Sequence, residues 1–594
     1  MSQTRPIDEH SMHTRTCGEL RFENVGEEVT LTGWVSRRRD HGGLIFCDLR
    51  DREGITQLTF DPEHSDGDAF KIAETMRPEW PIKIHGVVRA RGEETTNTKL
   101  ATGEIEVLTD HAEVLNTSVT PPFQIEDGIE TSEDTRLRYR YLDLRRPEMM
   151  ANLKLRSDFT FAIREALHNR EFMEVETPSL FKSTPEGARD FIVPSRIQPG
   201  NFYALPQSPQ LLKQLLMVSG VERYYQLARC YRDEDFRADR QPEFTQLDME
   251  MAFVDQEDVM AMAEKVIAAI WKSAGYDIKL PIQRITWQDA MDKYGSDKPD
   301  LRIDLVLTDA TEVMQGCGFA AFEGQTVKAI VVDGFTATRK QIDAICAEVE
   351  VQTARKGFWF RVDENGEFVG GISKFLQDRK EEVIKALGLK NGDFVGLAAG
   401  KKLEAQKTAG VYRKLLGAAS EKHMKKDCYE FCWIVDFPMY EIGEESGELE
   451  FCHNPFSMPQ GGMDALNNQD PLEILAYQYD LVCNGVELSS GAVRNHDPEI
   501  MIKAFELVGL GEADVKAKFP AMYNAFCYGA PPHAGIAPGV DRMIMLICGE
   551  ESIREIIPFP MNKNAMDIMM GAPGTVEQKQ LDELHLAITA KPEE

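Results

Sequence analysis

The chain has 594 residues, far more than one hydrophobic core organises, and a usual domain size of roughly 150 residues predicts about four domains. Hydrophobic residues make up 42% and charged residues 28%, and no apolar run approaches the roughly 20 residues of a membrane helix, so the composition predicts a soluble globular protein without a membrane span. The formal net charge of −31 argues against a uniformly basic nucleic-acid binder, and RNA contact is expected only where arginines cluster.

The N-terminal residues and the cysteines predict a cytoplasmic protein. The first ten residues contain no apolar stretch of the kind found in a secretory signal. The eleven cysteines show no CxxC spacing, which favours reduced thiols in a cytosol. Cys428 and Cys432 are the closest pair, and we expect them to be small buried side chains.

Five short strands are expected in the first 120 residues. Apolar and polar residues alternate over residues 29–35, as in a half-buried strand, and a glycine-rich turn follows at residues 41–43. The other expected strands are residues 44–49, 55–60, 82–90 and 105–107. Five strands with turns predict a small barrel, and an OB-fold is the economical choice, although composition alone leaves other small barrels open. OB-folds commonly bind single-stranded nucleic acid.

Two arginine clusters are candidates for contact with RNA. Three consecutive arginines lie at residues 37–39, and five more crowd the segment that follows the barrel, namely Arg136, Arg138, Arg140, Arg145 and Arg146. Each cluster is either a basic stripe for RNA or an ordinary solvated surface. The double proline at residues 121–122 ends the barrel, and we interpret residues 121–150 as a hinge.

Helices and strands alternate beyond the hinge. Leu155, Phe159, Ile163 and Leu167 recur every four residues and predict an amphipathic helix, and another helix is expected at about residues 256–273. Residues 285–426 carry their own helix and strand signals and few paired arginines and carboxylates, which indicates an inserted domain. The expected divisions are residues 1–120, 121–150, 151–286, 287–428, 429–570 and a C-terminal extension at 571–594.

Two segments carry the parts of a nucleotide site. Residues 232–248 and 535–542 place arginines, carboxylates and an aromatic side chain on hydrophobic stretches. Such groups could hold a nucleoside triphosphate with magnesium and let a carboxylate react with its α-phosphate. Neither segment is one of the familiar phosphate-binding loops.

The order of these segments resembles the class II aminoacyl-tRNA synthetases. Residues 174–178, 232–248 and 539–542 are similar to motifs 1, 2 and 3 of that class, and residues 183–190, 207–210, 294–300 and 436–438 look like those of the bacterial-type aspartyl-tRNA synthetases, a class IIb family. The resemblance implies an α+β multidomain protein with an N-terminal OB-fold barrel for the anticodon, an antiparallel-sheet catalytic domain and an inserted α+β (GAD-type) domain. It further implies a homodimer that uses ATP, Mg2+, L-aspartate and tRNA(Asp).

The resemblance also assigns residues. Arg232 resembles the arginine that grips the α-phosphate, and Phe244 and Arg542 resemble the pair that sandwiches adenine, so Arg232 and Arg542 are the candidate catalytic residues. The full ATP set is Arg232, Asp233, Glu234, Gln241, Phe244, Glu487, Gly539, Val540, Asp541 and Arg542. The aspartate set is Glu186, Gln210, Lys213, Arg232, Asp248, His453 and Arg494. Arg494 and Lys213 match the cations for the side-chain carboxylate, and they are expected to reject asparagine because an amide would leave them without a counter-charge.

The remaining assignments concern the metal and the tRNA. Asp480 and Glu487 match the magnesium ligands of the family. Arg39, Phe46 and Gln57 match anticodon contacts, with Phe46 stacking on a base. The family divides into enzymes that charge only tRNA(Asp) and enzymes that also charge tRNA(Asn); His41 resembles the relaxed group, whereas Glu94 stands where that group usually has glycine. Asn454 departs from the family, since many relatives carry a second histidine there.

The sequence therefore predicts an aspartate–tRNA ligase that forms aspartyl-adenylate and diphosphate and then transfers aspartate to the 3′ end of tRNA(Asp), with tRNA(Asn) as a further expected substrate. Two alternatives remain open at this point. An asparaginyl-tRNA synthetase shares the architecture but has no use for Arg494 with Lys213. A non-catalytic RNA-binding paralogue would not need Arg232, Arg542 and Glu487. No residue is predicted to be the general base of the transfer step.

Overall fold

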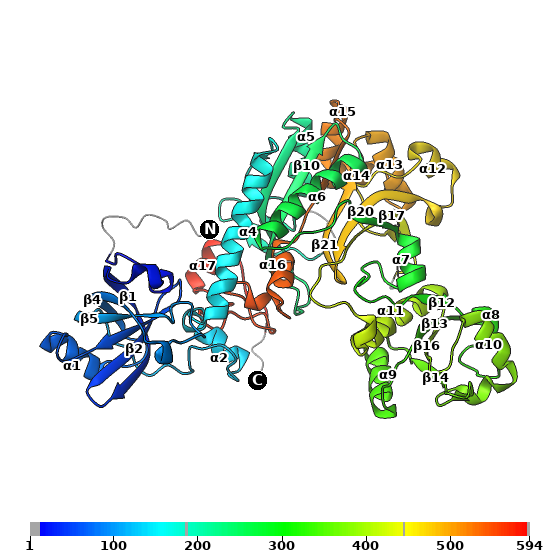
Figure 1. The fold of residues 1–594 in the computed structure, drawn as a ribbon. Coiled ribbons are helices and arrows are strands. Elements are labelled where there is room, and N and C mark those ends of the chain that lie inside the picture. Colours follow the sequence, from blue (N-terminus) through cyan, green and yellow to red (C-terminus); the bar gives the residue numbers. More distant parts are fainter. Residues whose placement is uncertain (1–11, 184–187, 444–445, 591–594) are drawn as a thin grey trace. The chain divides into compact units, whose positions relative to one another are not determined.

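The computed structural model describes residues 12–183, 188–443 and 446–590. The chain divides into two compact units, one made of residues 1–156 and 554–575 and the other of residues 157–553 and 576–594. Figure 1 traces the elements of both.

A closed five-stranded barrel occupies the first unit, in the order β1-β2-β3-β5-β4. Its elements are β1 (Glu28–His41), β2 (Leu44–Arg50), β3 (Ile55–Phe60), α1 (Gly67–Thr75), β4 (Pro81–Ala90) and β5 (Ile105–Val114). Buried and half-exposed residues alternate along β1 and β4, as expected when one face of a strand fills the barrel. All five strands predicted from the sequence are present, and the predicted OB-fold barrel is confirmed.

The arginine-rich segment after the barrel is largely internal. It forms α2 (Glu133–Arg138), α3 (Arg140–Asp143) and the start of α4 (Pro147–His168). Arg140 and Arg146 are buried and donate to the two carboxylate oxygens of Asp143 at 2.6 and 2.8 Å, and Arg136 binds both oxygens of Glu555 at 3.0 and 2.8 Å. The expectation of a basic stripe or a solvated surface is therefore wrong for these three arginines, because their charges are neutralised inside the unit.

An eight-stranded sheet forms the centre of the second unit. Its order is β11-β17-β20-β21-β22-β10-β9-β6, antiparallel except for the two edge pairs, β11 with β17 and β6 with β9. The strands are β6 (Met173–Glu174), β9 (Arg223–Tyr231), β10 (Glu243–Ala252), β11 (Gln283–Thr286), β17 (Phe431–Pro438), β20 (Leu475–Cys483), β21 (Val486–Val493) and β22 (His533–Ile536). The antiparallel catalytic sheet implied by the sequence is thus confirmed.

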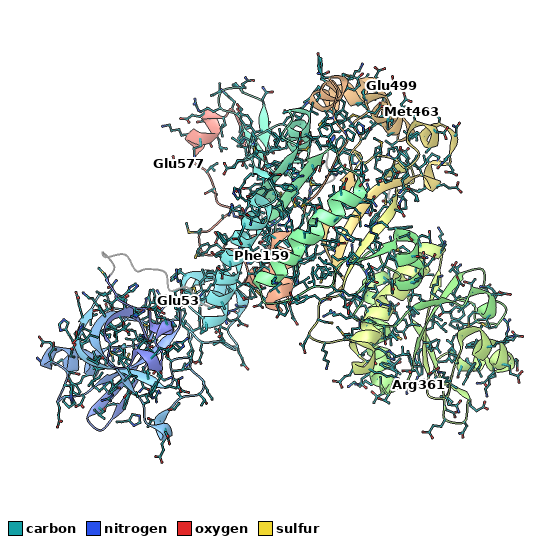
Figure 2. All side chains as sticks on the ribbon, turned by 45° about the horizontal axis from the view of Figure 1, so that its top comes forward. Glu53, Phe159, Arg361, Met463, Glu499 and Glu577 are labelled. Carbon is teal, nitrogen blue, oxygen red and sulfur yellow. The ribbon has the colours of Figure 1, made fainter. Side chains whose placement is uncertain are left out.

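Helices cover this sheet and bury its apolar side chains. They include α5 (Gln210–Val218), α6 (Gln256–Ser273) and α16 (Val540–Cys548). The bounds of α6 agree with the predicted helix, and Asp255 caps its first turn by accepting from the backbone N–H of Asp258. Phe159 lies on α4 (Figure 2). Its ring meets that of Trp271 on α6 edge to face, with ring centroids 6.5 Å apart.

A separate five-stranded sheet lies within the predicted insertion. Its antiparallel order is β12-β13-β16-β14-β15, with bounds β12 (Leu307–Asp309), β13 (Thr326–Val332), β14 (Phe358–Val362), β15 (Phe368–Val369) and β16 (Phe394–Gly400). Its helices are α8 (Thr311–Met314), α9 (Arg339–Thr353), α10 (Lys380–Leu387) and α11 (Lys402–Ala418). The preceding helix α7 (Trp287–Tyr294) instead packs Ala290 against Cys432 and Ile434 of the eight-stranded sheet, so the five-stranded sheet begins well after residue 287.

The second unit is completed by short elements. Two small sheets pair β7 (Ile192–Pro194) with β8 (Phe202–Ala204) and β18 (Tyr440–Ile442) with β19 (Leu449–Phe451). The later helices are α12 (Gly462–Asn468), α13 (Pro498–Leu507), α14 (Glu512–Lys518), α15 (Pro520–Cys527) and α17 (Gln578–Glu583). Each of the eleven cysteines is a free thiol. Among the described helices, none combines the length and the apolar character that crossing a membrane requires.

Candidate active site

A cavity of about 440 Å³ opens on one face of the eight-stranded sheet. Side chains from α5, β10, β21 and α16 and from the loop between β9 and β10 line it. Many residues that the sequence assigned to aspartate or ATP meet here, namely Gln210, Lys213, Arg232, Glu234, Gln241, Phe244, Asp248, His453, Glu487, Arg494, Gly539, Asp541 and Arg542. Segments up to about 300 residues apart along the chain therefore build one site.

Four charged side chains form an ion-pair network at one end of the cavity. Lys213 Nζ lies 2.6 Å from Asp248 Oδ1 and 3.4 Å from Glu250 Oε2. Arg494 donates from Nε and Nη2 to the two oxygens of Glu250 at 2.9 and 3.2 Å. All four are interior, with exposed side-chain fractions of 1% for Lys213, 0% for Asp248, 0% for Glu250 and 3% for Arg494. Such pairs fix both cations in place before any substrate arrives.

The pKa values of the two carboxylates in the network are shifted in opposite directions. Burial would raise the pKa of Glu250, but Arg494 and Lys213 together hold that pKa below its ordinary value. Burial raises the pKa of Asp248, and Lys213 offsets this only in part. Glu250 is thus the ionised counter-ion of Arg494, whereas Lys213 balances the negative charge of Asp248 only in part.

Unpaired buried polar atoms lie beside the network. Asp248 Oδ2, Gln210 Nε2, Gln478 Oε1 and Ser489 Oγ are buried and have no protein partner, although all four residues line the cavity. Buried polar atoms are normally hydrogen-bonded, so such a group indicates a ligand or water site. The set pairs an anionic acceptor at Asp248 with a neutral donor at Gln210, which suits a ligand carrying both an ammonium and a carboxylate.

The sequence reasoning did not find Glu250. The sequence did contain a sign of Glu250: it lies two residues after Asp248, so in a strand both side chains point to the same face of β10. Glu250 also corrects one expectation: Arg494 and Lys213 already have carboxylate partners, so an amide in the pocket would not leave both cations uncompensated. Discrimination must instead come from hydrogen bonding, because both cations are donors only and an amide NH2 offers them no acceptor.

The other end of the cavity holds the predicted nucleotide residues. The guanidinium of Arg232 lies over the ring of Phe244 with 5.1 Å to the centroid, and the backbone N–H of Arg232 donates to Pro242 O at 2.8 Å at the base of the loop between β9 and β10. Arg542 Nη1 donates to Glu487 O at 2.9 Å, and Arg542 Nη2 lies 3.3 Å from Asp239 Oδ2. An aromatic face and two guanidinium groups thus share this end.

The remaining residues predicted for ATP differ in position. Asp541 accepts from the backbone N–H of Thr245 at 2.8 Å, which ties the start of α16 to β10. The side chain of Val540 is fully buried in the core, and neither Val540 nor Asp233 lines the cavity. Glu234 lies 3.2 Å from Arg240, and Gly539 donates its N–H to Leu488 O at 2.8 Å.

The predicted metal ligands lie on the hairpin of β20 and β21. Asp480 is buried, and its pKa is raised well above the ordinary range by burial and by the charge of Glu487. Two carboxylates in this relation fit magnesium, a hard cation that takes oxygen ligands and keeps water or phosphate in its other positions. No group of three potential ligands that could hold a metal occurs among the described residues, so phosphate or water would have to complete the coordination.

His453 lies beside this end of the cavity and meets Phe437 edge to face, with ring centroids 4.8 Å apart. Burial lowers the pKa of His453, so its imidazole is neutral at pH 7. The neighbouring Asn454 turns its Oδ1 to the backbone N–H of Phe456 at 2.8 Å. Glu186, which the sequence placed near the substrate ammonium, lies outside the described residues.

The predicted anticodon residues gather on one face of the barrel. Arg39 and Phe46 are cross-strand partners on β1 and β2. Arg39 Nη2 donates to Asp48 at 2.7 Å and to Gln57 at 3.1 Å, and Gln57 in turn donates to Glu106 at 2.8 Å. Phe46 is half-buried and meets His41 edge to face at 5.7 Å between centroids, whereas Glu94 is exposed in a short helical turn.

Comparison with known proteins agrees with this geometry. A family described as "tRNA synthetases class II (D, K and N)" matches residues 132–563, and an "OB-fold nucleic acid binding domain" matches residues 29–115. The chain is 49% identical over 587 residues to an aspartate–tRNA ligase of Streptomyces avermitilis, covering 98% of this chain and 99% of that protein. It is also 49% identical over 603 residues to an aspartate–tRNA(Asp/Asn) ligase of Zymomonas mobilis, with 98% and 99% covered.

Solved structures share the fold. An aspartyl tRNA synthetase from Entamoeba histolytica matches with a TM-score of 0.56 and 20% identity, covering 92% of this chain and 90% of that one. An asparaginyl-tRNA synthetase from Pyrococcus horikoshii, complexed with asparaginyl-adenylate, matches with a TM-score of 0.56 and 19% identity, covering 92% and 97%. The extent of the family match and the full-length identity to these ligases show that the chain belongs to the class II tRNA synthetases of the D, K and N group.

Proposed function

We propose that this protein is an aspartate–tRNA ligase. The observation that carries the proposal is the buried network at the end of the cavity, where Arg494 and Lys213 are held as donors beside the unpaired Oδ2 of Asp248. An amino acid with a side-chain carboxylate would meet donors on one side and an acceptor for its ammonium on the other. Full-length relatives whose names state aspartate–tRNA ligation support the same substrate.

The first step joins aspartate to the α-phosphate of ATP and releases diphosphate. Arg232 would bind the α-phosphate, and Phe244 with Arg542 would hold the adenine between them, so that the α-carboxylate attacks in line. Asp480 and Glu487 would hold magnesium, which when bound neutralises phosphate charge. The protein's own contribution is therefore positioning and electrostatic stabilisation, with no covalent intermediate on the enzyme.

The second step transfers aspartate to the terminal ribose of tRNA(Asp). The barrel would read the anticodon, with Phe46 stacking on an unpaired base and Arg39 and Gln57 contacting phosphate or base edges. The half-buried position of Phe46 and the cross-strand pairing of Arg39 with it support this assignment. The transfer step is left without an assigned general base.

We further propose relaxed tRNA specificity, with both tRNA(Asp) and tRNA(Asn) as substrates. His41, which contacts Phe46 on the barrel, supports it, and Glu94 argues against it. Charging purified tRNA(Asp) and tRNA(Asn) side by side with labelled aspartate tests the proposal. Comparable charging of both is expected; charging of tRNA(Asp) alone would establish strict specificity, and charging of neither would point to a non-catalytic paralogue.

We propose a cytoplasmic homodimer as the working form. Exposed apolar side chains support a subunit interface in the second unit. They include Met173 next to motif 1, Phe202 on β8 and Ile197 in the turn between β7 and β8. Sedimentation equilibrium of the full chain is expected to give twice the mass of 67.0 kDa. A species at the single-chain mass across the working concentration range would contradict the dimer.

A further inference from the structure

The segment from Tyr294 to Asp300 is one of the segments that resemble the family, but no role in either proposed reaction step is assigned to it. It leads from α7 toward the five-stranded sheet. Helix α11 holds its first part: the guanidinium of Arg413 lies 4.9 Å from the centroid of the Tyr294 ring. Gly295 has a φ of +67°, and a Cβ there would lie 2.6 Å from the backbone N of Gly410, so the chain approaches α11 too closely for any other residue.

The other end of the segment is fixed against the hairpin of β20 and β21. Asp300 is buried, binds Arg302 at 3.0 and 2.7 Å, and accepts from Arg413 Nη2 through its backbone carbonyl at 3.0 Å. The turn of the hairpin packs on it, because a Cβ added at Gly485 would lie 3.1 Å from Asp300 Cβ. The hairpin that carries Asp480 and Glu487 is therefore braced by this segment.

Two charged residues lie between these anchors and face the hairpin. Lys298 Nζ lies 3.5 Å from Glu487 Oε2 and 3.5 Å from Asp297 Oδ1, and the backbone N–H of Lys298 donates to Ser296 Oγ at 3.1 Å. The charge of Asp297 adds to that of Glu487 in raising the pKa of Asp480, and Lys298 opposes them. The ammonium of Lys298 thus faces the carboxylates of Asp297 and Glu487, and its charge also acts on Asp480.

We propose that Lys298 is a positioning residue that occupies the cation position at Glu487 until the nucleotide binds, and that it thereby competes with a free divalent cation for this carboxylate. The inference rests on the proposed role of Asp480 and Glu487 as metal ligands. The ammonium must leave Glu487 before a metal takes that oxygen, and the phosphates of ATP offer it a new partner. Lys298 would thus keep a divalent cation off Glu487 in the nucleotide-free protein, and it would free that oxygen for a metal once phosphate is bound.

The test titrates Mn2+ alone, as the probe for the metal, into the nucleotide-free full-length protein and follows free Mn2+ by electron paramagnetic resonance. Lys298→Met is expected to bind Mn2+ about tenfold more tightly than the unmodified protein, since it removes one positive charge 3.5 Å from the Glu487 carboxylate. Lys298→Arg, which keeps the charge, is expected to bind as weakly as the unmodified protein. Lys293→Met is the matched control, because Lys293 on α7 pairs at 3.4 Å with the exposed Asp289.

Two results would overturn the proposal. One is equal Mn2+ affinity in Lys298→Met and the unmodified protein; the other is a gain that persists when Glu487→Gln is added, because the effect must act through Glu487. Lys298→Gln is measured in parallel, so that a folding defect of one variant does not decide the outcome. Aspartate-dependent exchange of pyrophosphate into ATP is run on the same preparations. If the unmodified protein shows no exchange but Lys298→Met binds Mn2+ more tightly, only the ligase function is refuted. If exchange is normal but Lys298→Met binds Mn2+ as the unmodified protein does, only the role of Lys298 is refuted.

Discussion

At the proposed amino-acid end of the cavity the charged side chains are interior, whereas at the proposed nucleotide end they are partly open to solvent. Lys213 and Arg494 expose 1% and 3% of their side chains, but Arg542, Glu487 and Lys298 expose 25%, 31% and 46%. Buried pairs are rigid and weakly screened, so they select one chemical group. Exposed groups are screened and can move, which suits the entry of a charged nucleotide and the release of pyrophosphate. On the proposed assignment, substrate selection and nucleotide binding are thus divided between the two ends.

The largest expected effect is that of Arg494→Leu at the buried end. The substitution removes the guanidinium that would bind the side-chain carboxylate of aspartate and leaves Glu250 with Lys213, 3.4 Å away, in place of two cations. The expected cost is about 4 kcal/mol, which corresponds to about a thousandfold loss in kcat/KM for aspartate. ATP binding, measured by calorimetry, is expected to be retained. Arg284→Leu is the control, since Arg284 forms an exposed pair with Glu257 and its loss should leave activation unchanged. Normal aspartate activation in Arg494→Leu would reject the pocket assignment.

Glu250→Gln tests the same end through stability. It leaves Arg494 without its counter-ion and is expected to lower the stability of the unit by about 3 kcal/mol, seen as a lower midpoint of thermal unfolding. Adding Arg494→Met should recover part of that loss, because the remaining unpaired charge is then removed. A midpoint equal to that of the unmodified protein would show that the pair of Glu250 and Arg494 does not hold the pocket together.

Gly410→Ala tests the brace that reaches the open end from α11. The new Cβ would lie 2.3 Å from Gly295 O, so a loss of about 2 kcal/mol is expected from overpacking against backbone. Calorimetric unfolding measures it, with Gly511→Ala as control, because a Cβ there meets nothing nearer than 3.8 Å. If both variants unfold alike, the close approach of α11 to the segment is not needed for stability.

Phe244→Leu tests the open end itself. Loss of the aromatic face is expected to weaken ATP binding by about 1 kcal/mol, or roughly fivefold in KM for ATP, while KM for aspartate changes little. Pyrophosphate exchange at varied ATP and at varied aspartate separates the two. A change confined to aspartate would reverse the assignment of the two ends.

The smallest effect concerns His533, which is fully buried on β22 beside the network. Burial lowers the pKa of His533 below its ordinary value of 6.5, although Glu250 opposes this. As pH falls below about 6.5, the unfolded chain therefore binds more protons at this histidine than the folded chain does. Neutral His533 thus contributes to stability above that pH. This contribution is lost as pH falls through the folded pKa of His533. Thermal midpoints at pH 7.5 and 5.5 should differ less in His533→Gln than in the unmodified protein. If the midpoints at the two pH values differ equally in both proteins, His533 does not contribute to the pH dependence of stability.

The sequence was informative wherever a local pattern decides the structure. Alternation along residues 29–35 led to the barrel, and the helix expected at about residues 256–273 agrees with α6, because strand and helix periodicity are local properties. The pairing of Arg494 with Glu250 joins residues 244 apart, and only the sheet order brings them together. Three of the five arginines after the barrel were misjudged for the same reason; Arg136, for example, binds Glu555, which is 419 residues away. Lys298 gave no local sign that it would face Glu487.

Exchange of pyrophosphate into ATP, with aspartate or asparagine as the only amino acid, tests most directly whether the buried network selects aspartate. Arg494 and Lys213 offer donors alone to the substrate side chain, so we expect exchange with aspartate and at least about a hundredfold less with asparagine. Equal exchange with asparagine, or no exchange with aspartate, would contradict it.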